Sequence, residues 1–120
     1  MADFIRPVTR VDINAAVPAA LYTWSALDLD DSGIPIECVD YVDRTVTITG
    51  TFGAAGSVTL QGSNDGTNWF PLTDMQANAI TKTAASMEMV IEAPVYIRPL
   101  VTAGDGTTNL VVKLFCRRTR

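Results

Sequence analysis

Hydrophobic and polar residues alternate along most of the chain from Tyr22 onward. The clearest example is residues 44–52, where Val46, Ile48 and Phe52 share one side and four threonines fall on the other. Successive side chains of a strand point to opposite faces of a sheet, so this pattern predicts a strand with one buried side.

Seven further short runs bring the total to about eight predicted strands. They cover residues 22–26, 34–39, 57–61, 69–72, 87–91, 95–101 and 110–117. Turn-forming residues separate the runs, and no stretch shows the three-to-four spacing of a long amphipathic helix. The pattern predicts an all-β fold, an antiparallel β-sandwich or jelly roll of about eight short strands.

Two glycine-containing turns predict how neighbouring strands connect. Residues 53–56, Gly-Ala-Ala-Gly, separate two alternating runs, and we expect residues 44–52 and 57–61 to pair as an antiparallel hairpin. The turn at residues 103–106 contains an Asp-Gly pair, which is favoured in tight hairpins. Proline lacks a backbone donor, so Pro71 is expected at a sheet edge or a strand end.

The first twenty residues depart from the alternating pattern. Residues 12–20 are alanine-rich and interrupted by Pro18, so they form either a short helical turn or an extended arm. We therefore divide the chain into an N-terminal arm or short helical segment, residues 1–20, and a single β-sandwich domain, residues 21–120. Such an arm either docks on a neighbouring subunit or is a frayed terminus.

Composition excludes several classes of protein. With 120 residues, 48% of them hydrophobic and 18% charged, the chain forms one folded domain with a real core. It contains no histidine, which removes Ser-His-Asp and Cys-His catalysis and histidine metal sites. We therefore expect a protein that is not an enzyme, with no cofactor and no catalytic, cofactor-binding or metal-binding residues.

The charge balance argues against two kinds of partner. Nine basic residues against 13 acidic ones give a net charge of -4, the reverse of a phosphate-binding protein, so nucleic acid is not expected as a partner. The N-terminus has no apolar signal region, and no later stretch approaches the roughly 20 apolar residues of a membrane span. We expect synthesis in the cytoplasm and no membrane partner.

Two short features have a structural and a chemical interpretation. Cys38 and Cys116 are too few for a disulfide framework or a zinc site, so buried thiols are favoured, with an inter-strand bridge left open. Residues 28–33 have oxygen ligands and a glycine where a calcium loop has them, but Val39 replaces the glutamate expected at the twelfth position. An acidic turn between two strands is favoured, and weak calcium binding is the alternative.

The run from Gly62 to Trp69 is the most distinctive in the chain. Asn64, Asp65 and Gly66 can adopt the backbone of a tight loop, and Trp69 can anchor the next strand in the core. A loop at one end of a sandwich can also contact a partner, which makes Asn64, Asp65 and Trp69 candidate contact residues. The run is similar to one in discoidin-type (coagulation factor 5/8 C-terminal-like) modules, which bind glycans or lipid headgroups.

Three of the seven arginines lie in the last four residues. Arg117, Arg118 and Arg120 are either a solvated strand end or a cationic tail that meets an acidic partner surface. Arginine pairs bidentately with carboxylates, so we include these three among the candidate contact residues.

Several runs together resemble small virion proteins of tailed bacteriophages. The resemblance lies in residues 22–24, 46–53, 62–69, 96–99 and 104–108. It implies a capsid decoration, or cement, protein on the outer surface of the virion head, with the major capsid protein as its partner. Such proteins usually sit as trimers over junctions between capsid subunits, so we expect a homo-oligomer, with a trimer favoured.

The sequence is also compatible with an alternative function. The chain is then a carbohydrate- or receptor-binding β-sandwich of a phage tail or baseplate, with Trp69 or Trp24 stacking on a sugar face. Under the decoration hypothesis, self-association buries apolar strand faces or edges, for which Tyr22, Trp24 and Phe115 are candidates.

Overall fold

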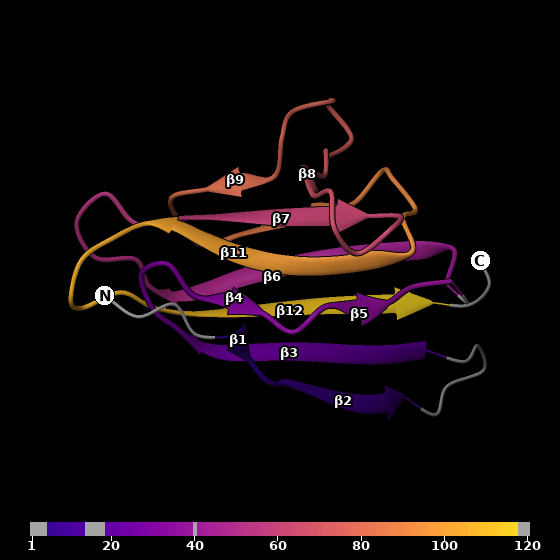
Figure 1. The fold of residues 1–120 in the computed structure, drawn as a ribbon, viewed down its shortest axis with the longest axis horizontal. Coiled ribbons are helices and arrows are strands. Elements are labelled where there is room, and N and C mark those ends of the chain that lie inside the picture. Colours follow the sequence, from indigo (N-terminus) through magenta and orange to yellow (C-terminus); the bar gives the residue numbers. More distant parts are fainter. Residues whose placement is uncertain (1–4, 14–18, 40, 118–120) are drawn as a thin grey trace.

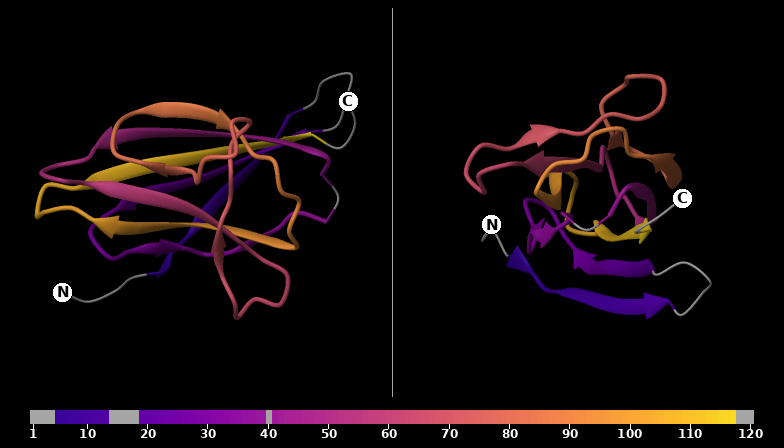
Figure 2. Two further views of the ribbon diagram at one scale, coloured as in Figure 1. Left: turned by 90° about the horizontal axis from the view of Figure 1, so that it is seen from above. Right: turned by 90° about the vertical axis from the view of Figure 1, so that its right-hand side faces the viewer.

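The computed structural model describes residues 5–13, 19–39 and 41–117, and within these ranges it contains twelve strands and no helix. The strands form two sheets, one of seven strands and one of five. Figure 1 shows most strands running along the long axis, and Figure 2 shows the layers from above and from one end. The predicted all-β sandwich is confirmed, and it has more than eight strands because five of them span only two residues each.

The seven-stranded sheet has the order β1-β4-β11-β7-β8, with β5 also paired to β11 and β9 to β7. Its strands are β1 (Ile5–Arg6), β4 (Ser32–Gly33), β5 (Ile36–Glu37), β7 (Ser57–Ser63), β8 (Phe70–Pro71), β9 (Thr81–Lys82) and β11 (Tyr96–Ala103). Pro71 therefore lies in the edge strand β8, as its missing backbone donor predicts.

The five-stranded sheet is antiparallel throughout and has the order β10-β6-β12-β3-β2. Its strands are β2 (Val8–Ile13), β3 (Ala19–Leu27), β6 (Asp43–Thr51), β10 (Ser86–Met89) and β12 (Asn109–Arg117). The three central strands are long and lie beside each other, so this sheet forms a broad layer of the molecule (Figure 1).

The core is built from the alternating residues of both sheets. In β12 the residues at every second position are all buried: Leu110, Val112, Leu114 and Cys116. Val46 and Ile48 of β6 are buried too, and Phe52 packs against the core from the strand's end, which confirms the predicted apolar side of that strand.

Trp24 of β3 is completely buried, and its indole Nε1 donates a 2.9 Å hydrogen bond to the carbonyl oxygen of Ile34. The ring packs against Gly33, where an added Cβ would lie 2.3 Å from Trp24 Cδ1. A glycine at this position therefore lets the backbone of β4 approach the tryptophan.

The predicted hairpin of residues 44–52 with residues 57–61 is wrong. β6 pairs with β12 and β10, whereas β7 pairs with β11, so the connection 52–56 crosses from one sheet to the other. The tight hairpin that the Asp-Gly pair indicated at residues 103–106 is wrong as well, because the connection 104–108 runs from β11 to β12, which lie in different sheets. A turn sequence specifies a chain reversal, but it does not decide whether the two strands pair or face each other across a core.

The two crossing connections hold each other at one end of the sandwich. The Asp105 Oδ2 atom accepts a 2.8 Å hydrogen bond from the Ala54 amide, and the Thr108 hydroxyl donates to the Phe52 carbonyl at 2.8 Å. Both connections lie at the left-hand end of Figure 1. These contacts join segments about fifty residues apart, which a local pattern does not reveal.

The described part of the N-terminal segment is extended. β1 pairs in parallel with β4 in the seven-stranded sheet, and β2 pairs with β3 at the edge of the five-stranded sheet. Residues 5–13 therefore reach both sheets of the same chain, and no helix occurs in them. The stretch 14–18, including Pro18, lies outside the described residues. The docking of this segment on another subunit stays a prediction.

Candidate partner-binding surfaces

The loop between β7 and β8 is organised around one carboxylate. Asp65 Oδ1 accepts hydrogen bonds of 2.8 Å from the amides of Thr67 and Asn68, and Oδ2 accepts one of 2.8 Å from Asn68 Nδ2. The Ser63 hydroxyl donates to Oδ1 at 3.0 Å. These bonds, led by that from the Asn68 amide, hold the pKa of Asp65 well below its usual range.

Only one residue of this loop has left-handed backbone. Gly66 has φ +76°, whereas Asn64 and Asp65, for which the sequence also allowed it, do not. Asn64 instead ties the loop to the neighbouring segment, since its Oδ1 accepts a 3.1 Å hydrogen bond from the Val95 amide. The predicted tight loop is confirmed, and its side chains hold its shape from within.

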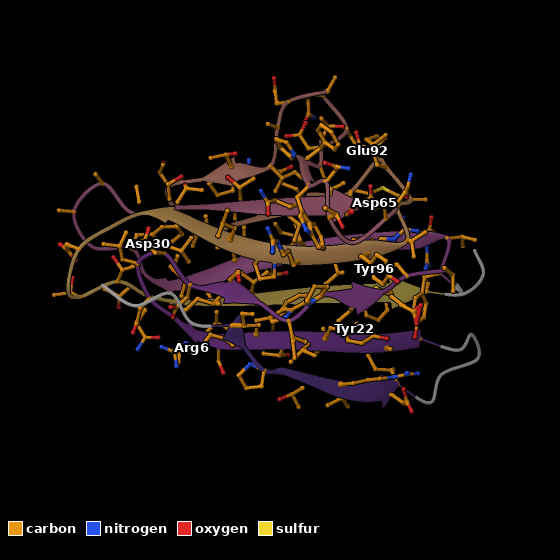
Figure 3. The ribbon with its side chains drawn as sticks, viewed as in Figure 1. Arg6, Tyr22, Asp30, Asp65, Glu92 and Tyr96 are labelled. Atoms are coloured by element: carbon orange, nitrogen blue, oxygen red, sulfur yellow. The ribbon has the colours of Figure 1, made fainter. Side chains whose placement is uncertain are left out.

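A pocket of about 590 Å³ opens beside this loop. Its lining combines polar loop residues with apolar residues of β8 and the segment before β11: Gly62, Ser63, Asn64, Asp65, Asn68, Phe70, Pro71, Leu72, Glu92, Ala93 and Pro94. Phe70 is 67% exposed and is the aromatic residue of this lining. Figure 3 places Asp65 and Glu92 at the same end of the molecule.

The second carboxylate of the pocket is also engaged by the fold. Glu92 Oε1 accepts a 2.7 Å hydrogen bond from the Thr73 amide, and Oε2 accepts one from the Thr73 hydroxyl. Burial raises the pKa of Glu92, but the hydrogen bonds from Thr73 outweigh it and leave the pKa lowered. Asp65 and Glu92 therefore act as acceptors that shape the walls of the pocket.

The two tryptophans occupy different positions from those expected. Trp69 is half-buried outside the core, with the guanidinium carbon of Arg98 4.1 Å from its ring centroid. Arg98 is fixed in turn by a 3.0 Å hydrogen bond from its Nε to Gln61. The prediction that Trp69 anchors the core is wrong, because the loop returns over the outer side of β7 and β11, where Arg98 covers the ring. Trp24 is the buried indole.

The candidate C-terminal contact residues are described only in part. Arg117 Nη2 lies 2.7 Å from Asp43 Oδ2, so this arginine pairs within its own chain. Arg118 and Arg120 lie outside the described residues. β7 and β12 both end on the right in Figure 1, so Asn64, Asp65 and Arg117 share one end of the sandwich but belong to different sheets.

The acidic turn at residues 28–33 holds an arginine of the N-terminal segment. Arg6 Nε lies 2.7 Å from Asp31 Oδ2, and Arg6 Nη2 lies 3.3 Å from Asp28 Oδ2. The turn connects β3 to β4, which confirms an acidic turn between two strands. Within the described ranges no group of three or more histidine, cysteine or acidic side chains could hold a metal ion.

The outer face of the five-stranded sheet is a surface that the sequence analysis missed. Strand register aligns one row of residues across all five strands: Met89, Thr45, Phe115, Leu21 and Val11. A neighbouring row consists of Met87, Thr47, Lys113, Thr23 and Thr9. We call these ten residues the outer face.

Apolar and threonine side chains dominate this outer face. Met87 is 66% exposed and Val11 is 53% exposed, while Phe115 and Leu21 are half-buried. The sequence contained one indication of this face: in β12, the apolar residues Val111 and Phe115 occupy outward positions, which alternate with the core residues. Of the apolar residues expected to mediate self-association, Phe115 lies on this face, but Tyr22 and Trp24 are buried in the core, so those two choices are wrong.

Within the described residues the structure contains no helix that could span a bilayer. No model of a protein family matches the sequence, and no curated protein matches it either. The comparison with solved structures does find similar folds. The SPBc2 prophage-derived protein YomS has 12% sequence identity and a TM-score of 0.60, over 89% of this chain and 98% of that chain. At this identity the likeness concerns the fold alone.

Two further structures share less of the fold. A cupin domain from Bordetella pertussis Tohama I has 10% identity and a TM-score of 0.46, over 96% of this chain and 97% of that chain. An oxalate oxidase has 14% identity and a TM-score of 0.47, over 92% of this chain and 50% of that chain. These scores are too low to bear on the chemistry of this chain.

Proposed function

We propose that this chain is a non-catalytic structural protein of a phage virion, specifically a capsid decoration protein that binds the outside of the head. The observation that carries the proposal is the outer face of the five-stranded sheet, a broad apolar and hydroxyl-bearing surface presented by one rigid layer. Contiguous exposed apolar surface of this kind marks contact sites with other proteins. The fold likeness to a protein of prophage origin supports the phage context.

The mechanism is mass action. A protein that binds the assembled shell but not its dissociated subunits shifts the equilibrium toward the shell. A trimer placed over a junction of major capsid subunits adds multivalency, so that each single contact can be weak. In this account the outer face sits on the shell, and the loops at the ends of the sandwich face away from it or toward neighbouring copies.

The test is binding to emptied particles, or to recombinant shells of the major capsid protein, from the phage that encodes the chain. Co-sedimentation should show saturable binding of the wild-type protein. Met87→Glu should weaken it about tenfold or more, because a charge would be buried at the contact. Met75→Glu is the matched control, since Met75 is 61% exposed but lies between β8 and β9, and it should bind like the wild type.

Two results would contradict this proposal. One is the absence of binding to shells at any concentration at which the protein remains folded. The other is an equal loss of binding in Met87→Glu and Met75→Glu, because the outer face would then have no special role.

A second candidate function is supported by one observation, the pocket beside Phe70. In this alternative the chain is a carbohydrate- or receptor-binding module of a tail or baseplate, and the exposed Phe70 ring supplies the stacking surface. Trp24 cannot serve because it is buried, and the ring of Trp69 is covered by Arg98. Binding of host glycans that is lost in Phe70→Ala, together with no binding to shells, would select this function.

A further inference from the structure

The edge strand β2 carries a charged residue on the inner side of its sheet. Val8 and Arg10 lie directly opposite Trp24 and Tyr22 of β3, and both of these aromatic residues are buried in the core. Residues opposite each other in an antiparallel pair point to the same face, so Arg10 also points inward. Val8 packs against the core, whereas Arg10 is exposed. The seven-stranded sheet therefore leaves the sandwich open beside Arg10.

A cavity of about 420 Å³ lies at this opening. It is bounded by β2, at the edge of the five-stranded sheet, and by the segment around β5 of the seven-stranded sheet, with Arg10, Tyr22, Ile36 and Tyr41 among its lining residues. Glu37 also borders it, but this residue follows the buried Ile36 along β5. Alternate residues of a strand point to opposite faces, so the Glu37 carboxylate is directed away from the cavity. Among the lining residues, the charge directed into the opening is thus that of Arg10.

The guanidinium group of Arg10 has two nitrogen atoms available to a ligand. Its Nε atom donates a 2.9 Å hydrogen bond to Asp12 Oδ1, and within the described part of the chain Nη1 and Nη2 have no hydrogen-bond partner. The guanidinium carbon lies 5.8 Å from the centroid of the Tyr22 ring, which is part of the cavity wall. Adjacent N–H donors of an arginine match the two oxygens of a carboxylate.

Two tyrosine hydroxyls supply a further donor. The hydroxyl oxygens of Tyr22 and Tyr41 are 3.3 Å apart, and the two rings pack edge to face with their centroids 6.3 Å apart. The pair carries two hydroxyl hydrogens and its mutual hydrogen bond uses one, which leaves one O–H donor for a ligand. Burial, together with the hydrogen bond with Tyr41, raises the pKa of Tyr22, so this hydroxyl stays protonated at neutral pH.

We propose that this cavity binds a small organic carboxylate, with Arg10 and the Tyr22–Tyr41 hydroxyl pair donating to the carboxylate oxygens. The free side-chain groups that meet here are hydrogen-bond donors, which selects an acceptor group with negative charge. The cavity is larger than a carboxylate alone, and Ile36 and Val39 line part of the remainder, so the ligand needs an apolar body. This inference stands independently of the proposed function, because the residues of the outer face point to the opposite side of the sheet.

The ion pair of Arg10 with Asp12 leaves room for such a ligand. The side chains of the two residues are 55% and 67% exposed, respectively. Ion pairs between exposed side chains are weak because water screens them. A ligand that reaches Nη1 and Nη2 therefore shares the guanidinium with Asp12, and the negative charge of Asp12 lowers the affinity for the ligand.

The experiment follows the NMR spectrum of the isotope-labelled full-length chain during titration with sodium benzoate. Benzoate should shift the backbone amide signals of Arg10, Tyr22 and Tyr41 and the Nε–H signal of Arg10, and these shifts should saturate. Benzamide has nearly the same shape but no charge. Titrated at the same ionic strength, it should bind about tenfold more weakly or worse, because it does not pair with the charge of Arg10.

Three variants assign the roles of the charged groups. Arg10→Gln should weaken benzoate binding about tenfold or more, and the exposed position of Arg10 lets the variant fold. Lys82→Gln is the matched control, because it removes one positive charge from β9, outside the cavity lining, and it should bind benzoate like the wild type. Asp12→Asn keeps an acceptor for Nε but removes a negative charge, so it should strengthen benzoate binding about threefold.

The proposal is overturned if benzoate and benzamide bind the wild type equally, or if Arg10→Gln binds benzoate as the wild type does. Shifts confined to residues outside the cavity would also overturn it. Inorganic phosphate and a blocked tripeptide with a central glutamate distinguish the source of the anion, and an affinity for either that equals that for benzoate would exclude a small organic carboxylate as the ligand. The comparison of ligands on the wild type decides the matter even where a variant fails to fold.

Discussion

At the scale of single residues, polar side chains hold the connections of this sandwich. Asp65 satisfies the amides of its own loop, Glu92 secures Thr73, and Asp105 joins two connections that are distant in sequence. Each carboxylate accepts hydrogen bonds from backbone amides, which are available only in the folded state. Their contribution to stability therefore depends on their ionisation.

Asp105 gives a pH-dependent prediction. Hydrogen bonds from the Thr107 hydroxyl and the Ala54 and Thr107 amides lower its pKa from 3.8 to about 2 in the folded chain. A lowered folded-state pKa adds stability above the unfolded-state value, and that stability is lost as the pH falls through the folded-state value. Asp105→Asn should thus lower the unfolding temperature at pH 7, and the difference from the wild type should shrink between about pH 4 and pH 2.

Thermal unfolding measured across this pH range checks the Asp105 prediction. Asp65 is present in both proteins, so its own titration cancels in the comparison. A difference between the two proteins that stays constant down to pH 2 would refute the role given to the Asp105 carboxylate.

At the scale of elements, strands were more predictable than their partners. Each of the eight expected runs contains a strand, because inward residues such as Val46, Ile48 and Leu114 alternate with outward ones and burial enforces that period. The pairing was predicted wrongly at residues 53–56, since the partners of β6 and β7 lie in different sheets. That choice depends on contacts such as Asp105 with Ala54, which no local pattern contains.

The candidate sites were less predictable than the strands, because they also depend on contacts between segments that are distant in the sequence. The Gly62–Trp69 loop could be predicted from its local sequence, because Asp65 accepts hydrogen bonds from residues only a few positions away. The pocket beside it also needs Glu92 and Pro94, which come from a distant segment. The outer face likewise arises from strand order, which the sequence pattern leaves open.

The connection between β6 and β7 gives a prediction at the scale of elements. Gly53 has φ +73°, and an added Cβ would lie 2.3 Å from Asp105 Oδ1. Gly53→Ala should destabilise the fold by about 1–3 kcal/mol, because alanine is strained in this backbone region and displaces the Asp105 carboxylate. Denaturant unfolding at pH 7 measures the effect.

Ala55 supplies the contrasting variant in the same connection. It already has a left-handed φ of 57°, so Ala55→Gly removes an unfavourable Cβ and should leave stability unchanged or slightly raised. Equal destabilisation by Gly53→Ala and Ala55→Gly would contradict the proposed role of this connection.

At the scale of the whole molecule, the sandwich separates its surfaces by sheet and by end. The five-stranded sheet presents the outer face, one end carries the Asp65 loop with its pocket, and the other end carries the crossing connections (Figures 1 and 3). Contact with a shell and contact between copies can therefore use different parts of one rigid body.

This separation predicts that self-association and shell binding are independent. Light scattering coupled to size-exclusion chromatography should give the mass of a trimer for the wild type. Met87→Glu should give the same mass, because the outer face is assigned to the shell rather than to neighbouring copies. A monomer at high protein concentration, or a trimer lost in Met87→Glu alone, would contradict this assignment.

The central claim, that the outer face of the five-stranded sheet seats the protein on a capsid, is tested most directly by a cryo-electron microscopy reconstruction of shells incubated with the protein. The account predicts sandwich-shaped density over junctions of major capsid subunits, with the side chains of Met87 and Phe115 turned toward the shell. Bound sandwiches whose five-stranded sheet faces solvent, or shells without added density at saturating protein, would contradict it.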